Sequence, residues 1–255
     1  MTQRRPQIQT GPLIQTGPFA EKDAFQELNT RLGALPQEVL CESGRFLYSS
    51  IDTLDKGDYY FLGYNPGGAP EKHLKTLRDE IKDWQFYPKG WNAYCDEKWS
   101  TELQDRVKIL FGLIAKPSEN GGEAALRRTC ASNLIFTRSS GKKSLPHSIK
   151  ENAKDVFWPI HQEILNIVKP RCIIVYDKDA YDIFRKRLGN PHEDTHPIEA
   201  SHAYVKKSCL RIVNGGFSSE VRLDHEVKLI YIPHLSYYGL EDDHATQNRI
   251  KEMFK

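Results

Sequence analysis

Residues 59–68 have the sequence YYFLGYNPGG, a continuous apolar run that ends in a turn rich in glycine and proline. Further apolar runs follow at residues 132–136, 172–176 and 228–232. Each run is short and lacks the alternation of a half-exposed strand, which is typical of parallel strands covered on both faces. Helical patterns separate the runs, so the sequence predicts an α/β fold.

Amphipathic patterns between these runs predict the helices. Phe25, Leu28 and Leu32 recur at helical spacing, and comparable patterns follow later in the chain. The first helical pattern begins at residue 21, and further helices are expected at residues 103–114, 160–168, 180–188 and 242–254.

The composition predicts one globular domain. Of the 255 residues, 39% are hydrophobic, which is enough for one core and too many for a disordered chain. We predict a flexible N-terminal arm at residues 1–19, where the pentapeptide IQTGP occurs twice, and a single α/β domain at residues 20–255. No apolar run is long enough to span a membrane and no secretory signal is present, so we expect a cytoplasmic protein. The net charge of +2 neither requires nor excludes nucleic acid.

Metal chemistry has little support in the sequence. The five cysteines include no C-x-x-C pair, which argues against zinc ribbons, zinc-dependent deaminases and most iron–sulfur clusters. His192, His196 and His202 lie near acidic residues, but their spacing suits neither one helix face nor a standard ligand pair. We expect no metal and no cofactor.

Three predicted strands end in polar side chains, namely Asn65, Asn133 and His234. In open parallel sheets, ligands bind where loops leave the carboxyl ends of the strands. Each residue also has a structural explanation: Asn65 in a tight turn, Asn133 bonded to local backbone, and His234 as a packed side chain. Their common placement favours a binding or catalytic site.

Taken together and in this order, four segments resemble the uracil-DNA glycosylase superfamily. Residues 60–67 resemble its first motif, in the Gly-x-Asn-Pro-Gly form of the mismatch-specific uracil/thymine branch. Residues 132–134, with Arg138, resemble a strand whose asparagine reads the base edge. Residues 164–175 resemble a helix, a Lys-Pro turn and the third strand, and residues 231–236 resemble the His-Pro-Ser motif.

The resemblance covers residues 55 to 240, and it includes departures. Leu235 replaces the proline of His-Pro-Ser, and Tyr176-Asp177 replaces the usual Leu-Gly after the third strand. The first 50 residues and the insert at 70–100 match no motif of the family. The missing cysteine pattern excludes the branches that carry an iron–sulfur cluster. The resemblance thus indicates a divergent member whose substrate need not be uracil.

The resemblance implies a three-layer α/β/α sandwich around a four-stranded, mainly parallel sheet. It also implies hydrolysis of the N-glycosidic bond of a flipped base in duplex DNA, which leaves an abasic site. In that reaction Asn65 positions the attacking water, His234 stabilises the charge on the leaving base, and Asn133 reads the base edge. We expect a monomer that acts without a cofactor.

Further residues are assigned to binding. Those expected to contact the base are Gly63, Tyr64, Gly67, Asn133, Phe86 and Tyr87, with Trp84 and Trp91 as other candidates for stacking. Those expected to contact DNA are Arg138, Lys142, Lys143, Ser236, Tyr237 and Tyr238. The alternative for each aromatic residue is packing in the core.

The substrate hypothesis depends on Gly67. In the strictly uracil-specific branch, a tyrosine at this place blocks groups on the pyrimidine 5-position, so a glycine admits a 5-modified base. The chain is similar to prokaryotic antiviral glycosylases that remove glucosylated 5-hydroxymethylcytosine from phage DNA. Alternatives are uracil/thymine mismatch repair, an inactive DNA-binding module, an enzyme of single-stranded or transfer-RNA substrates, and a small-molecule hydrolase, against which the missing nucleophile elbow argues.

Overall fold

The structure is a computed structural model that describes residues 22–70, 75–98, 102–145, 147–188, 198–199, 204–210, 227–236, 240 and 244–254. The strands are β1 (Tyr59–Gly63), β2 (Cys130–Asn133), β3 (Cys172–Val175), β4 (Ile198–Glu199), β5 (Tyr204–Leu210) and β6 (Val227–Tyr231). The α-helices are α1 (Lys22–Gly33), α2 (Gln37–Cys41), α3 (Leu77–Trp84), α4 (Ala93–Asp96), α5 (Glu102–Ile114), α6 (Gly122–Arg127), α7 (His147–Val168), α8 (Lys178–Arg187) and α9 (His244–Met253). Short 3-10 helices are η1 (Ile51–Thr53), η3 (Pro117–Glu119) and η4 (Lys142–Ser144). The predicted arm at residues 1–19 lies outside the described residues.

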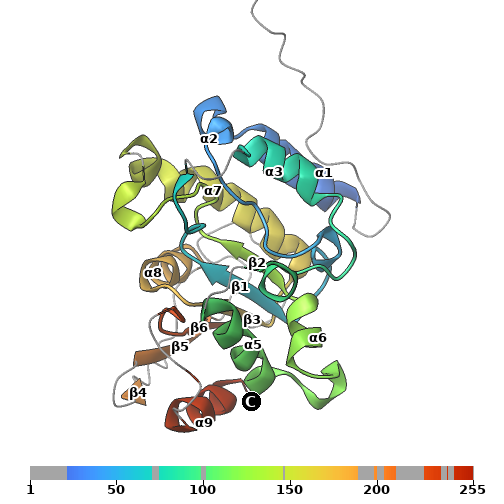
Figure 1. Cartoon of the computed structure of the whole chain (residues 1–255), viewed down its shortest axis with the longest axis vertical. Coiled ribbons are helices and arrows are strands. Elements are labelled where there is room, and N and C mark those ends of the chain that lie inside the picture. The colour runs from blue at the N-terminus through green and yellow to red at the C-terminus, as the bar shows by residue number, and fades with distance from the viewer. Residues whose placement is uncertain are drawn as a thin grey trace, which may run out of the picture.

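One sheet, with the strand order β2-β1-β3-β6-β5-β4, organises the chain (Figure 1). The strands β2, β1, β3 and β6 pair in parallel, which confirms the predicted α/β class and its parallel core. The four predicted strands form the parallel part of the sheet, and β5 and β4 extend it in antiparallel pairing beyond β6. The sequence of β5, YVKKSCL, explains the omission. Lysines and a serine interrupt its apolar pattern, as is common in strands near the edge of a sheet.

Helices cover both faces of the sheet, so the molecule has three layers (Figure 1). Alternate residues of β1 point to opposite faces, since strand side chains alternate with a period of two. Tyr60 and Leu62 pack in the core that includes α1, α3, α7 and α8. Tyr59 and Phe61 pack in the second core, beneath α5, α6 and α9. Among the described residues, no helix combines the length and the apolar character needed to cross a bilayer.

Two predicted boundaries were wrong. β2 ends at Asn133 rather than at residue 136, although Leu134 and Ile135 still donate backbone hydrogen bonds to the carbonyls of Gly63 (3.0 Å) and Tyr64 (2.9 Å). α7 begins at residue 147 rather than 160, because the helix continues through Pro159. A proline usually ends a helical pattern, since it lacks the N–H that the helix needs.

His161 of α7 links the first core to the end of β2. Its side chain is fully buried, and its Nε2 lies 2.9 Å from the carbonyl oxygen of Leu134. A carbonyl can only accept, so Nε2 carries the proton and Nδ1 accepts from the Tyr60 hydroxyl at 2.8 Å. Burial lowers the pKa of His161 from 6.5 to about 4, so the ring is neutral in the folded protein.

This buried histidine predicts a loss of stability in acid. Between the unfolded pKa of 6.5 and the folded pKa of about 4, the unfolded state binds one more proton than the folded state. The free energy of unfolding should therefore fall as the pH falls, by up to about 3 kcal/mol through this group. Urea denaturation at about pH 7 and about pH 5 measures the change. His161→Gln removes the titrating group and should flatten the profile; an unchanged slope in this variant would contradict the assignment.

Candidate functional site

The parallel pairing brings the ends of four strands to one edge of the sheet. Gly63 pairs with Asn133, and Val175 pairs with both Leu62 and Tyr231. The turn after β1 carries Asn65, β2 ends in Asn133, and the segment after β6 carries His234. The polar residues predicted from the sequence therefore come from strand ends that share this edge.

Gly63 allows close packing where these strands end. A methyl group added at Gly63 would overlap the Asn133 amide oxygen and the hydroxyl of Tyr176, the residue that follows β3. Because Gly63 has no side chain, the Asn133 amide and the Tyr176 hydroxyl can both lie against the backbone of β1 at this position.

Gly63→Ala should consequently destabilise the protein. Overpacking at a filled position typically costs about 1–3 kcal/mol, and both neighbours here are buried. Urea denaturation measures the loss. Gly112→Ala in α5 is the matched control, because a methyl group there meets no atom within 4 Å and should change stability by at most about 1 kcal/mol in the favourable direction. Equal stability of the two variants would show that position 63 is not closely packed.

Asn133 is buried, and no hydrogen bond of normal geometry to a described residue uses its amide group. Its side chain is 1% exposed, and neither amide atom has a hydrogen-bond partner of normal geometry among the described residues. The amide does lie close enough to the Tyr48 hydroxyl to oppose the rise in the pKa of that phenol. A buried polar group without a partner is costly, so an unpaired donor and acceptor side by side suit a ligand that supplies both partners.

Tyr48 and Tyr176 lie near this amide, and Tyr94 contacts both of them. The Tyr176 hydroxyl lies 3.1 Å from that of Tyr94, and the Tyr94 ring stacks on Tyr48 with 5.5 Å between centroids. The guanidinium of Arg45 lies over the Tyr48 ring at 4.9 Å. Burial raises the pKa of each of the three phenols, so their hydroxyls are neutral at physiological pH. These three tyrosines were not identified as site residues from the sequence. Tyr176 could have been found, because it directly follows the apolar run 172–175.

Asn65 keeps its acceptor oxygen available. Its Nδ2 donates to the Ser139 hydroxyl at 2.8 Å and to the Pro66 carbonyl at 2.9 Å. Within the described residues its Oδ1 accepts no recorded hydrogen bond. The two donations fix the orientation of the amide and leave the oxygen as an acceptor for a ligand or a water.

His234 is held as a neutral ring with a defined tautomer. The backbone N–H of Ser236 donates to Nδ1 at 3.2 Å, which leaves the proton of the neutral ring on Nε2. Burial lowers the pKa of His234; Asp177 opposes this shift and Lys142 adds to it. At neutral pH the ring can therefore donate a hydrogen bond from Nε2 without carrying a positive charge.

Tyr176 lies between the ends of β1 and β6, because β3 is the strand between them. Its ring meets His234 edge to face, with 5.4 Å between centroids, and its hydroxyl lies next to Gly63. The Tyr176 ring is therefore an aromatic surface beside His234, which a ring bound next to this histidine would meet.

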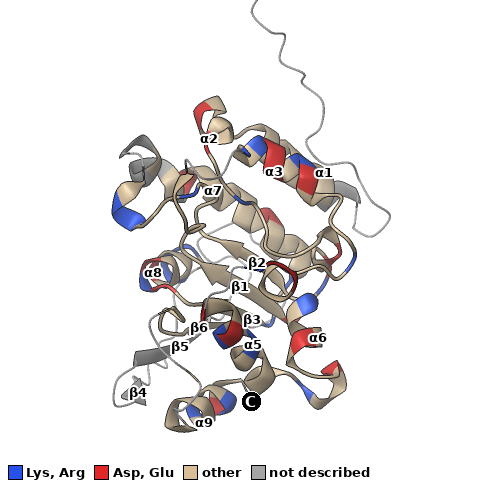
Figure 2. Ribbon diagram, in the orientation of Figure 1, with Lys and Arg blue, Asp and Glu red and all other residues tan. Residues whose placement is uncertain are grey.

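Two of the cations predicted to contact DNA have partners within the protein. Lys142 lies 2.7 Å from both Asp177 and Asp179 and over the ring of Tyr64 at 4.4 Å, and Arg138 donates to the Gly67 carbonyl. Lys143 is exposed and has no recorded ion pair among the described residues. Figure 2 shows the basic stretch that precedes α7. Arg138 and Lys142 thus hold the 64–67 turn, while Lys143 is free to meet a phosphate; Tyr237 and Tyr238 lie outside the described residues.

Some aromatic side chains of the insert at residues 70–100 lie in the core and others lie at the surface. Trp84 is fully buried and donates to the Ser49 carbonyl at 2.7 Å, so its assignment as a stacking candidate is wrong. Tyr87 is half-buried, packs against Trp91 and donates to Glu80 at 3.1 Å. Phe86 is 73% exposed, and it is the one large hydrophobic side chain of the described residues that faces solvent to this extent.

Among the described residues, no group of three histidine, cysteine, aspartate or glutamate side chains is placed to hold a metal ion. His192, His196 and His202 lie outside those residues. The sequence matches no protein-family model, and a search of curated proteins gives no significant match.

Proposed function

We propose that this chain is a monofunctional DNA glycosylase, of the uracil-DNA glycosylase type, that hydrolyses the N-glycosidic bond of a flipped pyrimidine. The unpaired, buried amide of Asn133 carries the proposal. A pyrimidine edge presents a donor beside an acceptor, and a carboxamide complements both. A nucleobase edge would therefore satisfy both atoms at once.

The reaction places negative charge on the base and positive charge on the sugar. The bond between C1′ and the base nitrogen breaks, its electron pair leaves with the base, and water adds to C1′ and loses a proton to solvent. The Nε2–H of His234 would donate to the departing base as its charge grows. The Asn65 oxygen would accept from the water and orient it, although an amide cannot remove the proton. Tyr176 would supply the aromatic surface beside the base.

The proposed substrate is a 5-modified pyrimidine, with glucosylated 5-hydroxymethylcytosine of phage DNA as the leading candidate. A methyl group added at Gly67 meets no atom of the described residues within 4 Å, so there is room beside this turn. The proposed setting is the prokaryotic cytoplasm, with duplex DNA bound by a monomer, and Phe86 and Lys143 are the exposed side chains available to it. A uracil/thymine mismatch glycosylase is the alternative within the same chemistry.

Release of a free base tests the proposal. Purified protein is incubated with unmodified DNA, uracil-containing DNA and DNA with glucosylated 5-hydroxymethylcytosine, and abasic sites and free base are measured. We expect release from the modified DNA and a slower or absent reaction with the other two. Binding of DNA without release would identify an inactive binding module, and equal inactivity with no binding would reject the nucleic-acid function.

Gly67→Tyr tests the specificity. A tyrosine ring at this position should exclude a 5-substituent while admitting uracil. Because overpacking typically costs about 1–3 kcal/mol, we expect the ratio of the rates on modified and uracil-containing DNA to fall by about tenfold or more. Gly67→Ala, which adds only one methyl group in open space, is the control and should leave the ratio unchanged. Equal losses on both DNAs in the tyrosine variant would speak against this role of Gly67.

A further inference from the structure

A concave surface lies at the opposite edge of the sheet, where the parallel strands begin. Residues just before or at the start of β1, β2 and β3 line it, together with η3, α6 and the end of α9. Its volume is about 930 Å³, within the range of small-molecule sites. The length of the sheet separates this pocket from Asn65, Asn133 and His234.

The charge of this pocket is strongly positive. Its lining includes six cations and two carboxylates, a surplus of four positive charges, whereas the whole chain has a net charge of only +2. The charged residues of the lining are Lys56, Lys116, Arg128, Lys169, Arg171, Lys228, Asp58 and Glu119. This edge therefore concentrates positive charge far beyond the average of the chain.

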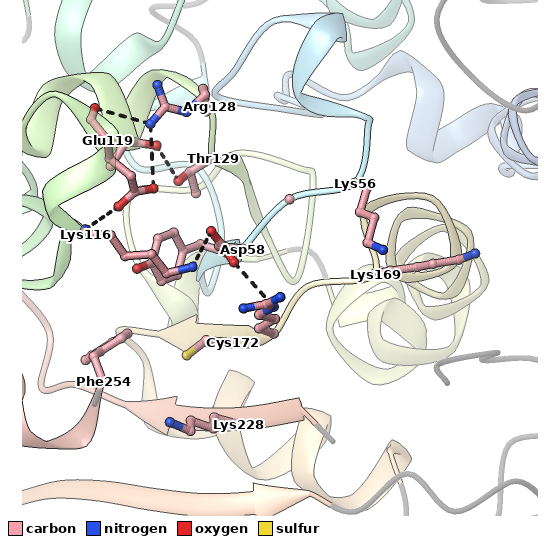
Figure 3. A pocket seen from close by; sticks show the side chains of 14 residues that line it. Lys56, Asp58, Lys116, Glu119, Arg128, Thr129, Lys169, Cys172, Lys228 and Phe254 are labelled. Atoms are coloured by element: carbon pink, nitrogen blue, oxygen red, sulfur yellow. Dashed lines mark hydrogen bonds and ion pairs between the residues drawn. The ribbon is translucent and has the colours of Figure 1, made fainter. Parts of the chain in front are cut away.

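The two carboxylates satisfy only some of these cations. Asp58 pairs with Lys116 at 2.7 Å and with Arg171 at 3.7 Å, and Glu119 pairs with Arg128 at 3.7 Å (Figure 3). Lys56, Lys169 and Lys228 form no recorded ion pair with any described residue. Figure 3 shows Lys56 and Lys169 on one side of Asp58 and Arg128 on the other. Asp58 lies between these cations and holds Lys116 and Arg171, so an anionic ligand would bind beside this carboxylate.

Lys169 occupies a position that favours glycine. It follows α7 with a φ of 45°, in the left-handed region, and its backbone N–H caps the helix by bonding to Leu165 at 2.8 Å. Lys169 also lines the pocket, where it adds a positive charge that a glycine would lack.

The pocket also has an apolar wall. Tyr59, Cys172 and Ala125 are buried in its lining, and Phe254 meets Tyr59 with 6.2 Å between ring centroids. The Tyr59 hydroxyl is already used, because it donates to the Ile114 carbonyl at 3.1 Å. The wall therefore offers a flat hydrophobic surface next to the cations.

We propose that this pocket binds a small molecule carrying a di- or triphosphate group, with the phosphates among Lys56, Lys228 and Arg171 and any attached ring against Tyr59 and Phe254. Charge-assisted bonds from lysine and arginine are the usual means of holding phosphate. The pocket lies on the edge opposite the proposed base site, so DNA whose flipped base enters that site would not reach it. The inference is independent of the glycosylase activity.

Calorimetric titration of the full chain with inorganic triphosphate, and separately with ATP, both without metal, tests the proposal. We expect saturable binding at one site for both probes, tighter for ATP if its ring uses the apolar wall. The double variant Lys56→Gln/Lys228→Gln should weaken the binding of both probes by about tenfold or more, since each charged hydrogen bond contributes substantially. Both lysines lie outside the core, so this variant should fold normally.

Lys82→Gln on α3 is the matched control, because Lys82 is exposed and lies outside the pocket. It should leave binding unchanged. No saturable binding up to about 1 mM would overturn the proposal, as would equal binding by the double variant. Competition by a short DNA duplex for the same lysines would assign the pocket to nucleic acid instead. The rate of base release should be the same in the double variant as in the wild type, which keeps this test separate from that of the proposed function.

Discussion

His234→Ala should lower the single-turnover rate of base release by about 100-fold to 1000-fold, the usual effect of removing one donor to a developing negative charge. The backbone N–H of Ser236 donates to Nδ1 of His234, which places the proton of the neutral ring on Nε2, and burial lowers the pKa of the ring. DNA affinity should change little, since the donor matters most when charge has formed on the base. Rates measured with excess protein separate this effect from binding.

His244→Ala is the matched control for this variant. His244 begins α9, where it is exposed to solvent. Its replacement should leave the rate unchanged. If His234→Ala kept the wild-type rate on a substrate that the wild type cleaves, His234 would have no part in the chemistry, and its ring would serve only to pack against Tyr176.

Asn133→Ala should combine a large loss of activity with little loss of stability. Loss of two hydrogen bonds to the base edge should lower kcat/KM by about 100-fold, because such bonds discriminate by about 1–3 kcal/mol. The amide has no partner of normal geometry among the described residues, so its removal relieves a buried unpaired group. The small cavity left behind offsets part of that gain.

Ser132→Ala provides the comparison on the same strand. Ser132 is fully buried and donates to the Phe46 carbonyl at 2.7 Å. Its replacement should cost about 1 kcal/mol of stability and leave base recognition intact. Denaturation and activity measured on both variants should therefore show opposite patterns. A loss of stability in Asn133→Ala that exceeds the loss in Ser132→Ala would mean that Asn133 is a structural residue.

The continuous apolar runs and the helical spacing of apolar residues predicted much of the fold. The runs at 59–62, 172–176 and 228–232 became β1, β3 and β6 because buried parallel strands have a continuous apolar sequence that few other elements share. β5 was not predicted as a strand, because two lysines and a serine occupy the middle of its sequence. The short helices α2, α4 and α6 were not predicted, because four to six residues are too few to show a helical period.

The candidate site was predicted less completely than the fold. Asn65, Asn133 and His234 could be found because each follows an apolar run. Tyr48 and Tyr94 lie in irregular structure and in a short helix, and no local pattern places them beside Asn133. The internal partners of Arg138 and Lys142 were likewise unpredictable, since the hydrogen bond of Arg138 and the ion pair of Lys142 join residues that are distant in sequence.

A crystal structure of the protein with duplex DNA that contains an abasic site, grown in the presence of the free base, examines the proposed base site most directly. We expect the sugar at the Asn65 oxygen and the base beside Tyr176, with its edge on the Asn133 amide and an oxygen within hydrogen-bond distance of His234 Nε2. DNA bound at the opposite edge of the sheet, or an abasic nucleotide that stays within the duplex, would contradict the proposal.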